Sequence, residues 1–427
     1  MNRFFLVRFL VPLLAVASVC HRTTKICADA KPSADDEMVR VGQELFKHEW
    51  TPGDRFAGRG DGLGPVYNAK SCAACHKQAR IGGAGPLENN VKMGCVRDLK
   101  TGETRISVIH AFATREDFRE TLSHVAPGLP PLGALELREL SRGSANSHGS
   151  LGPKIGSLAG VTISDYSTTA LFGSGLIDAV PDGLILANER NQRLHWRRAD
   201  AKHETGPVGR APRLGGGRLG KFGRKAQISS LSNFVRSACA NELGLGSSSH
   251  AQATSLAKRD YRPPGLDLTD QQCDQITAFV ASLPRPIERA PQSPTTRARA
   301  ASGKTLFHSI GCADCHAVNL GSIEGLYSDL LLHRMGRELG GDGFYFDSTT
   351  GPLVVTGDTP QDDEWRTPPL WGVADSAPYL HDGRAATLSE AIRLHDGQGT
   401  KSSQQFARLA DSQKADLLIF LNTLRAP

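Results

Sequence analysis

The same spacing of hydrophobic residues occurs twice along the chain. Residues Leu268–Pro286 read L-T-D-Q-Q-C-D-Q-I-T-A-F-V-A-S-L-P-R-P, and residues Leu409–Pro427 read L-A-D-S-Q-K-A-D-L-L-I-F-L-N-T-L-R-A-P. Apolar residues recur at helical spacing in both segments, and Thr269 with Gln272 forms a capping box at the start of the first. Each segment is therefore predicted to be an amphipathic helix, and their match without a gap indicates an internal repeat.

The beginnings of the two copies match as well. G-Q-E-L-F at Gly42–Phe46 resembles G-K-T-L-F at Gly303–Phe307. Between the copies, the Pro- and Arg-rich stretch Pro284–Arg299 is typical of a linker. With 427 residues, the chain is long enough for two hydrophobic cores. We therefore expect a first domain over residues 31–286, a linker over 287–299 and a second domain over 300–427.

The first thirty residues have a different pattern. Arg3 and Arg8 flank the apolar run Phe9–Val19, which is too short to span a bilayer, and Ala28-Asp29-Ala30 follows as a cleavage site. Residues 1–30 are thus predicted to be a signal peptide that exports the chain to the periplasm. Without them the net charge falls from +6 to +3, which is too small to indicate binding to nucleic acid. No other segment is predicted to span a membrane.

A Cys-x-x-Cys-His motif occurs in each copy, as S-C-A-A-C-H-K at Ser71–Lys77 and as G-C-A-D-C-H-A at Gly311–Ala317. In an exported protein this motif attaches c-type haem, because two thiols bind the porphyrin vinyl groups and the imidazole reaches the iron. A thioredoxin-like site would need no histidine, and a zinc ribbon would bring its cysteine pairs closer together in sequence. The motifs predict two covalently bound haems c, held by Cys72, Cys75 and His76 and by Cys312, Cys315 and His316.

The expected fold is mainly α, with two cytochrome-c-like helical domains, each around one haem. Residues Met93–Asp165 have no counterpart in the second copy and are predicted to be a long irregular insertion. The basic residues between Arg190 and Lys225 are interpreted as a solvated loop, and the alternative is a docking patch. Cys239 and Cys273 either form a disulfide or remain buried thiols.

The two copies diverge where a second axial ligand to each haem is expected. Aligned without a gap, Gly383–His395 corresponds to Gly223–Val235, so His395 lies on a predicted helix where the first copy has an aliphatic residue. A haem with histidine on both faces is suited to electron transfer, whereas one without a distal ligand can bind a small molecule such as peroxide. His395 is the first candidate ligand of the second haem, and the alternatives are Met335, His333 and His381. Met93 is a further candidate for the first haem.

A carboxylate lies close to the position without a ligand. In A-N-E-L-G at Ala240–Gly244, Glu242 is about two helical turns beyond Val235 and shares its face if the helix continues. A carboxylate beside an open haem could take a proton from peroxide and return it to the leaving oxygen, which makes Glu242 the candidate catalytic residue. The alternative is that Glu242 is an ordinary solvated glutamate at the end of a helix.

These features resemble those of the bacterial di-haem oxidoreductases, sometimes labelled thiol oxidoreductases. The resemblance is carried by S-C-A-A-C-H, by Y-S-D-L-L-L-H-R-M-G at Tyr327–Gly336, and by the segment from E-W-R-T-P-P-L-W-G to Y-L-H-D-G-R-A. The family is related to the di-haem cytochrome c peroxidases and to the methylamine-utilisation di-haem enzyme. It implies a reactive first haem and a second haem that transfers electrons. By resemblance, Glu242 occupies the place of the distal catalytic glutamate, and His395 that of the distal methionine or tyrosine.

The resemblance also implies a function and partners. The expected function is a periplasmic di-haem oxidoreductase of peroxidase type, acting on hydrogen peroxide or another small oxidant. A small redox protein would donate or accept the electrons, and calcium would be compatible with the resemblance. The alternatives are a di-haem electron carrier without a substrate of its own, and an oxidoreductase acting on sulfur compounds or on a partner protein.

Overall fold

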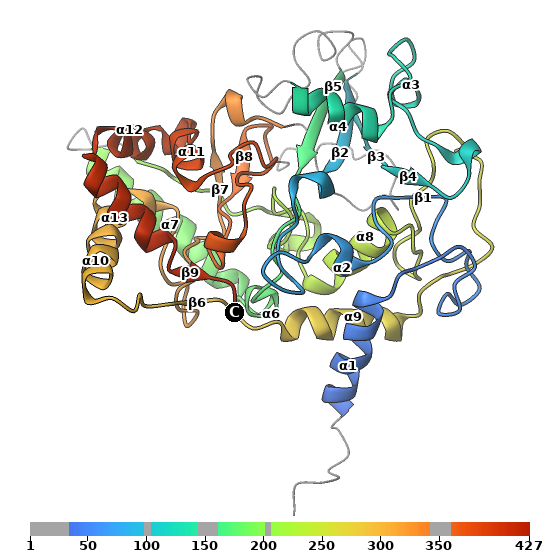
Figure 1. Ribbon diagram of the computed structural model, residues 1–427, viewed down its shortest axis with the longest axis horizontal. Coiled ribbons are helices and arrows are strands. Elements are labelled where there is room, and N and C mark those ends of the chain that lie inside the picture. Colours follow the sequence, from blue (N-terminus) through green and yellow to red (C-terminus); the bar gives the residue numbers. More distant parts are fainter. Residues whose placement is uncertain (1–33, 98–103, 144–160, 201–205, 342–359) are drawn as a thin grey trace, which may run out of the picture.

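The structure, a computed structural model, describes residues 34–97, 104–143, 161–200, 206–341 and 360–427, so the predicted signal peptide lies outside the described residues. The fold is mainly helical, with short antiparallel sheets (Figure 1). None of the helices in this part of the chain combines the length and apolarity needed to cross a bilayer. The longer helices are α1 (Ala34–Lys47), α4 (Ala134–Gly143), α7 (Asp182–Asp200), α8 (Leu231–Glu242), α9 (Asp270–Ser282), α10 (Pro294–Ser309), α12 (Thr400–Arg408) and α13 (Asp411–Leu421). The shorter helices are α2 (Cys72–Cys75), α3 (Leu122–Val125), α6 (Ser174–Asp178) and α11 (Leu388–Arg393).

The repeat predicted from the sequence corresponds to two helix crossings of the same design. In the first, α1 packs on α9 so closely that a Cβ at Gly42 would lie 1.8 Å from the backbone oxygen of Gln275. The rings of Phe46 and Phe279 meet edge to face beside this contact, with centroids 5.1 Å apart. The capping box of Thr269 at the start of α9 is present as predicted.

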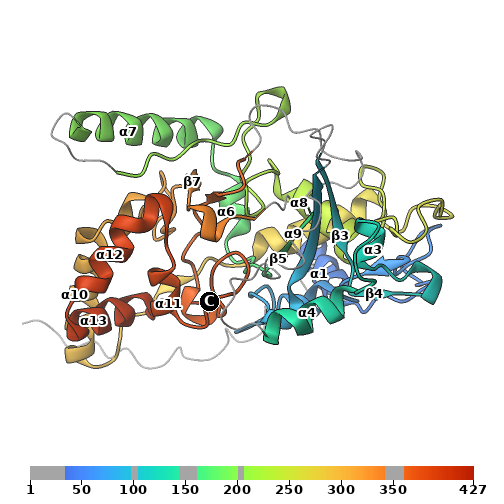
Figure 2. The ribbon, with the colours of Figure 1, turned by 90° about the horizontal axis from the view of Figure 1, so that it is seen from above.

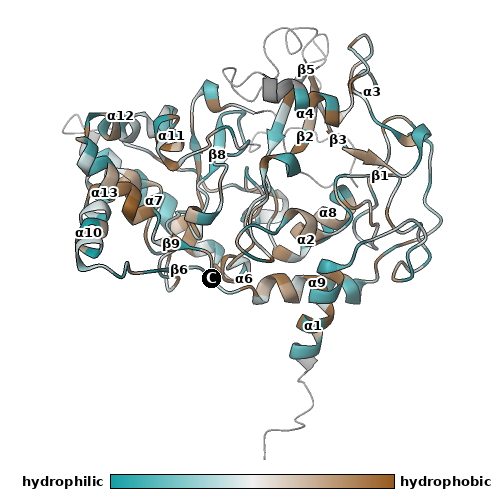
Figure 3. Ribbon diagram, viewed as in Figure 1, coloured by the Kyte–Doolittle hydropathy of each residue, from teal (hydrophilic) through white to brown (hydrophobic). Residues whose placement is uncertain are grey.

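In the second crossing, α10 packs on α13, and a Cβ at Gly303 would lie 2.0 Å from the backbone oxygen of Asp416. Phe307 and Phe420 repeat the edge-to-face contact at 5.5 Å. Each crossing thus needs a glycine for the close approach and a pair of phenylalanines beside it. Figure 3 shows hydrophobic and hydrophilic residues alternating along α1, as expected of an amphipathic helix. Helix α13, which was predicted to be amphipathic, is not, because its polar residues lie in its first half and its apolar residues in its second half.

Helix α10 begins inside the stretch that was predicted to be a linker. Ser293 caps the helix by accepting from the amide of Thr296, and Pro294 takes the first helical position, where its missing N–H costs nothing. The predicted linker therefore ends inside a helix. Part of it also forms strand β6 (Ile287–Glu288), which pairs with the C-terminal strand β9 (Leu424–Arg425).

The prediction that the insertion is irregular is wrong. Its described residues form a three-stranded antiparallel sheet in the order β3 (Thr104–Ile109), β2 (Val91–Arg97) and β5 (Val161–Tyr166). Helices α3 and α4 cover this sheet around a core of its own that includes Ile109, Leu122, Val125, Leu137 and Ile163. The remaining short strands pair as β1 (Val66–Tyr67) with β4 (Phe112–Ala113) and as β7 (Leu332–Arg334) with β8 (Glu364–Arg366).

The basic stretch is also not the solvated loop that was predicted. Its first part belongs to helix α7, which lies on the side of the molecule that holds α10 and α12 (Figure 2). At its other end Lys225 is fully buried, and its ammonium group donates to the backbone oxygens of Gln361, Asp362 and Glu364 at 2.9, 2.7 and 3.1 Å. Basic residues are thus used to join distant segments of the chain.

Candidate haem-binding site

One continuous cavity of about 480 Å³ is lined by both Cys-x-x-Cys-His motifs. Its wall includes the four motif cysteines, both motif histidines, and side chains from α8, α11 and the segments around β7 and β8. The described cysteines are free thiols, including the pair Cys239 and Cys273. The structure therefore brings two motifs that are far apart in the sequence to one site.

The first motif presents its imidazole in a fixed orientation. Ser71 caps the single turn α2 by accepting from the amide of Ala74 at 3.1 Å, and the amide of His76 donates to the oxygen of Cys72 at 2.9 Å. The Nδ1 of His76 lies 3.0 Å from the backbone oxygen of Thr169. Because a carbonyl oxygen can only accept, Nδ1 carries the hydrogen and Nε2 keeps a lone pair for a metal. Burial lowers the pKa of His76 to about 4, so the ring is neutral.

The second motif has the same arrangement. The amide of His316 donates to the oxygen of Cys312 at 3.0 Å, and its Nδ1 lies 3.0 Å from the oxygen of Tyr327. Burial lowers the pKa of this ring to about 4 as well. Both motif histidines thus offer a neutral Nε2 in a cavity whose thiols suit covalent attachment, and these residues fit c-type haems.

His395 is a third histidine of this kind. Its Nδ1 donates to the oxygen of Ala391 at 2.7 Å, it lines the cavity, and burial lowers its pKa. His395 and His316 line the same cavity. His395 does not lie on the helix as predicted, because α11 ends at Arg393, but its ring bonds back to the last turn.

The alternative ligands of the second haem lie in the same region. Met335 lines the cavity, and a Cβ placed on Gly399 would be 3.2 Å from its terminal methyl and 3.0 Å from the Cβ of His395. His381 also lines the cavity and stacks on Trp365 with ring centroids 3.9 Å apart, and burial lowers its pKa to about 3. Met335 is therefore the nearest competitor of His395 in space.

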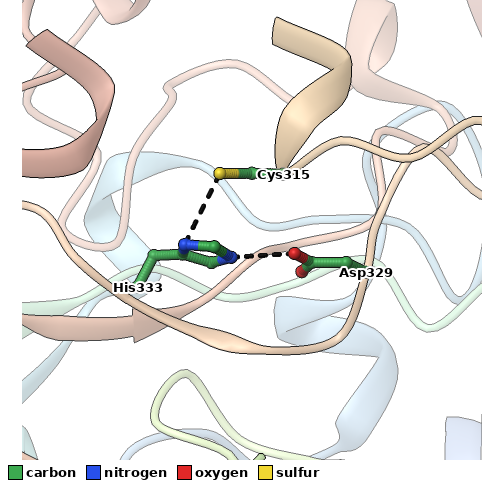
Figure 4. Close-up of side chains that lie close together, drawn as sticks. All are labelled: Cys315, Asp329 and His333. Atoms are coloured by element: carbon green, nitrogen blue, oxygen red, sulfur yellow. Dashed lines mark hydrogen bonds and ion pairs between the residues drawn. The ribbon is translucent and has the colours of Figure 1, made fainter. Parts of the chain in front are cut away.

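His333 has no lone pair to offer a metal. Its Nδ1 lies 2.8 Å from the Oε1 of Gln398. Its Nε2 lies 2.8 Å from a carboxylate oxygen of Asp329, as Figure 4 shows. Burial opposes a charge on this ring, but Asp329 raises its pKa well above the usual range. Cys315, 3.5 Å from Nδ1, completes a cluster that resembles a metal site. Because both ring nitrogens of His333 donate hydrogen bonds, we interpret this cluster as a hydrogen-bonded network beside the second motif and not as a metal site.

The first copy has an alanine where the second has His395. Helix α8 is capped by Ser230 and α11 by Thr387, and the eighth residue after the cap is Ala238 in one and His395 in the other. The gapless sequence register, which predicted Val235 here, is wrong because the segment before α8 is longer. Val235 lies in the hydrophobic core, whereas Ala238 lines the cavity.

Glu242, the last residue of α8, lies one helical turn beyond Ala238 and also lines the cavity. Among the described lining residues it is the one with a carboxylate. The amide nitrogen of the Asn68 side chain donates to Oε2 of Glu242 at 2.8 Å, and the Asn68 backbone donates to the Glu242 oxygen at 2.8 Å. Asn68 therefore fixes Glu242 in place.

Sequence reasoning missed this support, because Asn68 lies far from Glu242 along the chain. It also missed His110 of the insertion, which lies 2.7 Å from Glu120 and 3.0 Å from the oxygen of Asn241. Burial opposes protonation of His110, but Glu120 and, more weakly, Glu242 raise its pKa. Met93, the candidate ligand of the first haem, is buried in a cluster with Tyr166 and Trp365 and does not line the cavity.

Comparison with known proteins identifies one family. The family model described as "Di-haem oxidoreductase, putative peroxidase" matches residues 158–424. No curated protein sequence matches the chain.

Solved structures also match part of the chain. Hydrazine synthase of Kuenenia stuttgartiensis is 22% identical over 41% of this chain and 63% of its own, with a TM-score of 0.28. A MauG-like protein associated with microbial copper homeostasis is 24% identical over 36% and 52%, with a TM-score of 0.25. The diheme peroxidase BthA of Burkholderia thailandensis is 16% identical over 48% and 66%, with a TM-score of 0.33. The chain thus spans between about half and two thirds of these structures.

Proposed function

The chain belongs to the di-haem oxidoreductase family, and we propose that it attaches two haems covalently and acts as a peroxidase-like oxidoreductase. The observation that supports this most is the shared cavity, in which His76, His316 and His395 each keep Nε2 available. When bound, the haems supply iron centres that can bind a small oxidant and pass electrons.

The residues take different roles in the two copies. Cys72 and Cys75 bind one haem and Cys312 and Cys315 the other, as thioethers. His76 and His316 would each hold the iron of their haem through Nε2, and His395 would also hold the iron of the second haem. Ala238 offers no ligand atom at the position where the second copy has His395, so a haem held by the first motif would supply the reactive centre and one held by the second would supply electron transfer.

Glu242 is the acid–base group of the reaction. It accepts a proton from hydrogen peroxide and returns it to the oxygen that leaves as water, while Asn68 holds its carboxylate in position. Because the proton that Glu242 moves comes from the peroxide itself, two electrons and two further protons from solvent complete the conversion of peroxide to two water molecules. A small redox protein delivers the electrons.

The same proposal covers the architecture and the location. The two helix crossings with Gly42 and Gly303 support two cytochrome-c-like domains, at residues 31–286 and 300–427. The predicted signal peptide supports export to the periplasm. Calcium remains an expectation from the family resemblance alone.

Replacing Glu242 by Gln tests the proposed role of this residue. The variant keeps the shape of the side chain but cannot exchange a proton, so peroxide turnover should fall about 10²–10⁴-fold. Glu49→Gln, an exposed glutamate that does not line the cavity, is the matched control and should keep its rate. Unchanged turnover in Glu242→Gln would remove Glu242 from the mechanism and favour a di-haem electron carrier.

A further inference from the structure

The wall of the cavity carries more positive than negative side chains. Lys221, Arg224 and Arg366 line it, and Glu242 is the single carboxylate among the described lining residues. The ammonium group of Lys221 lies 3.3 Å from the carboxylate of Asp182, so its charge is matched. Arg224 and Arg366, in contrast, form no such ion pair among the described residues.

Arg224 has donors to spare. Its Nη2 donates to the backbone oxygen of Ser167 at 2.7 Å and to the hydroxyl of the same residue, while its Nε is buried without a hydrogen-bond partner among the described residues. Asp382 is the acid whose charge acts on Arg224. That carboxylate, however, is bound by the Nε of Arg384.

Arg366 is in the same situation. Its Nε donates to the backbone oxygen of Gly223 at 3.2 Å, and its Nη1 has only a long contact of 3.5 Å to the oxygen of Thr367. The acid whose charge acts on it is Asp329, which already lies 2.8 Å from His333. Within the described residues, neither guanidinium forms an ion pair with a carboxylate.

The two arginines come from different copies of the repeat and meet in the cavity. The amide of Arg366 donates to the backbone oxygen of Arg224 at 2.9 Å. Burial lowers the pKa of both groups to about 10, and the charge of Arg224 further lowers that of Arg366. Two neighbouring half-buried cations in a cavity wall, with no carboxylate paired to them among the described residues, are unfavourable unless an anion joins them.

We propose that Arg224 and Arg366 form an anion site that binds propionate carboxylates of the haems, with one guanidinium from each copy. This inference rests on the proposed covalent attachment of the haems. A guanidinium binds a carboxylate through two parallel N–H bonds, and both arginines keep donors for this purpose. A free oxyanion such as phosphate has the same chemistry, and the test distinguishes the two sources.

The test is a redox titration of the purified holoprotein and of Arg224→Gln and Arg366→Gln. Loss of a cation beside a propionate stabilises the oxidised haem. Each variant should therefore shift a midpoint potential downward by the equivalent of a tenfold change in the oxidised-to-reduced ratio, which is 59 mV for one electron. Lys221→Gln, which removes a matched charge from the same wall, should shift it less. Arg224→Lys and Arg366→Lys keep the charge and should recover part of the shift.

The outcomes separate this inference from the proposed function. A wild-type protein without two covalent haems by mass spectrometry would contradict the proposed function. Variants that hold two haems but shift no more than Lys221→Gln would overturn the anion site. If inorganic phosphate shifted the midpoint potentials of the wild type but not those of the arginine variants, the site would bind a free oxyanion instead of a propionate.

Discussion

The two copies of the repeat agree at the helix crossing and at the motif, and differ on the opposite side of the cavity. Gly42 and Gly303 allow the same close contact, and His76 and His316 are oriented by the same kind of backbone bond. Eight residues after the helix cap, however, the first copy has Ala238 and the second has His395. The helix crossings and the orientation of the motif histidines thus agree in the two copies, and at this position only the second copy offers an imidazole to the cavity.

The segments without a counterpart show a second difference. Helix α7 of the first copy reaches the second motif, where Gln192 donates to the oxygen of Asp314 at 3.1 Å and to the carboxylate of Asp329 at 2.7 Å. The inserted sheet packs Met93 and Tyr166 against Trp365 of the second copy. The additional segments of the first copy therefore complete the surroundings of the second.

Removal of the motif thiols should give the largest effect. Replacing Cys72 and Cys75 by Ala should reduce the covalent haem content from two to one per chain, and so should the same change at Cys312 and Cys315. Intact mass spectrometry measures the content. Cys95→Ala, a buried cysteine outside the motifs, should keep two haems, and a loss there would mean that the motifs are not the attachment sites.

Ala238→His should give the first copy a histidine at the position where the second copy has His395. Counted from the helix cap, the introduced imidazole takes the position of His395 and enters the same cavity, so the first haem should become six-coordinate and peroxide turnover should fall close to the level without enzyme. Electron paramagnetic resonance (EPR) measures the change from high spin to low spin. Ala238→Leu adds bulk without a ligand atom. Its spectrum should remain high spin, and a low-spin signal in that variant would contradict the comparison.

His395→Ala should make the second copy resemble the first. Its haem should change from low spin to high spin, because Ala removes the distal nitrogen. Met335→Leu, which removes the nearest competing ligand, should leave the spectrum unchanged. If Met335→Leu gave the high-spin signal and His395→Ala did not, the assignment of the distal ligand would be reversed.

A smaller effect concerns the stability of the insertion. Glu120 raises the pKa of buried His110, so this pair contributes fully below the unfolded-state pKa of about 6.5, and the contribution is lost as the pH rises through the folded-state value. Glu120→Gln should therefore lower the free energy of unfolding by about 3–5 kcal/mol at pH 6, and by less at pH 10. Denaturant unfolding measures the difference. Glu116→Gln breaks an exposed ion pair and should cost less than about 1 kcal/mol.

Local patterns in the sequence predicted the parts of the fold that depend on neighbouring residues. The helices at Leu268–Pro286 and Leu409–Pro427, the capping box of Thr269 and the repeat itself are present as predicted. The sheet of the insertion was missed, although V-T-I-S-D-Y at Val161–Tyr166 has the β-branched residues of a strand.

The parts that failed depend on loop length or on distant contacts. A difference in length before α8 shifted the register from Ala238 to Val235, and only the caps Ser230 and Thr387 reveal it. The contact of Asn68 with Glu242 joins residues that are far apart in the sequence. The contacts of buried Lys225 and half-buried Arg366 likewise depend on segments that the fold alone brings together.

The most direct test of the open first haem is low-temperature EPR of the purified ferric protein, with and without hydrogen peroxide. We predict a mixture of high-spin and low-spin signals, with the high-spin signal lost on adding peroxide, because Ala238 leaves one haem without a distal ligand. Two low-spin signals that do not respond to peroxide, before or after half-reduction, would contradict this account and indicate a di-haem electron carrier.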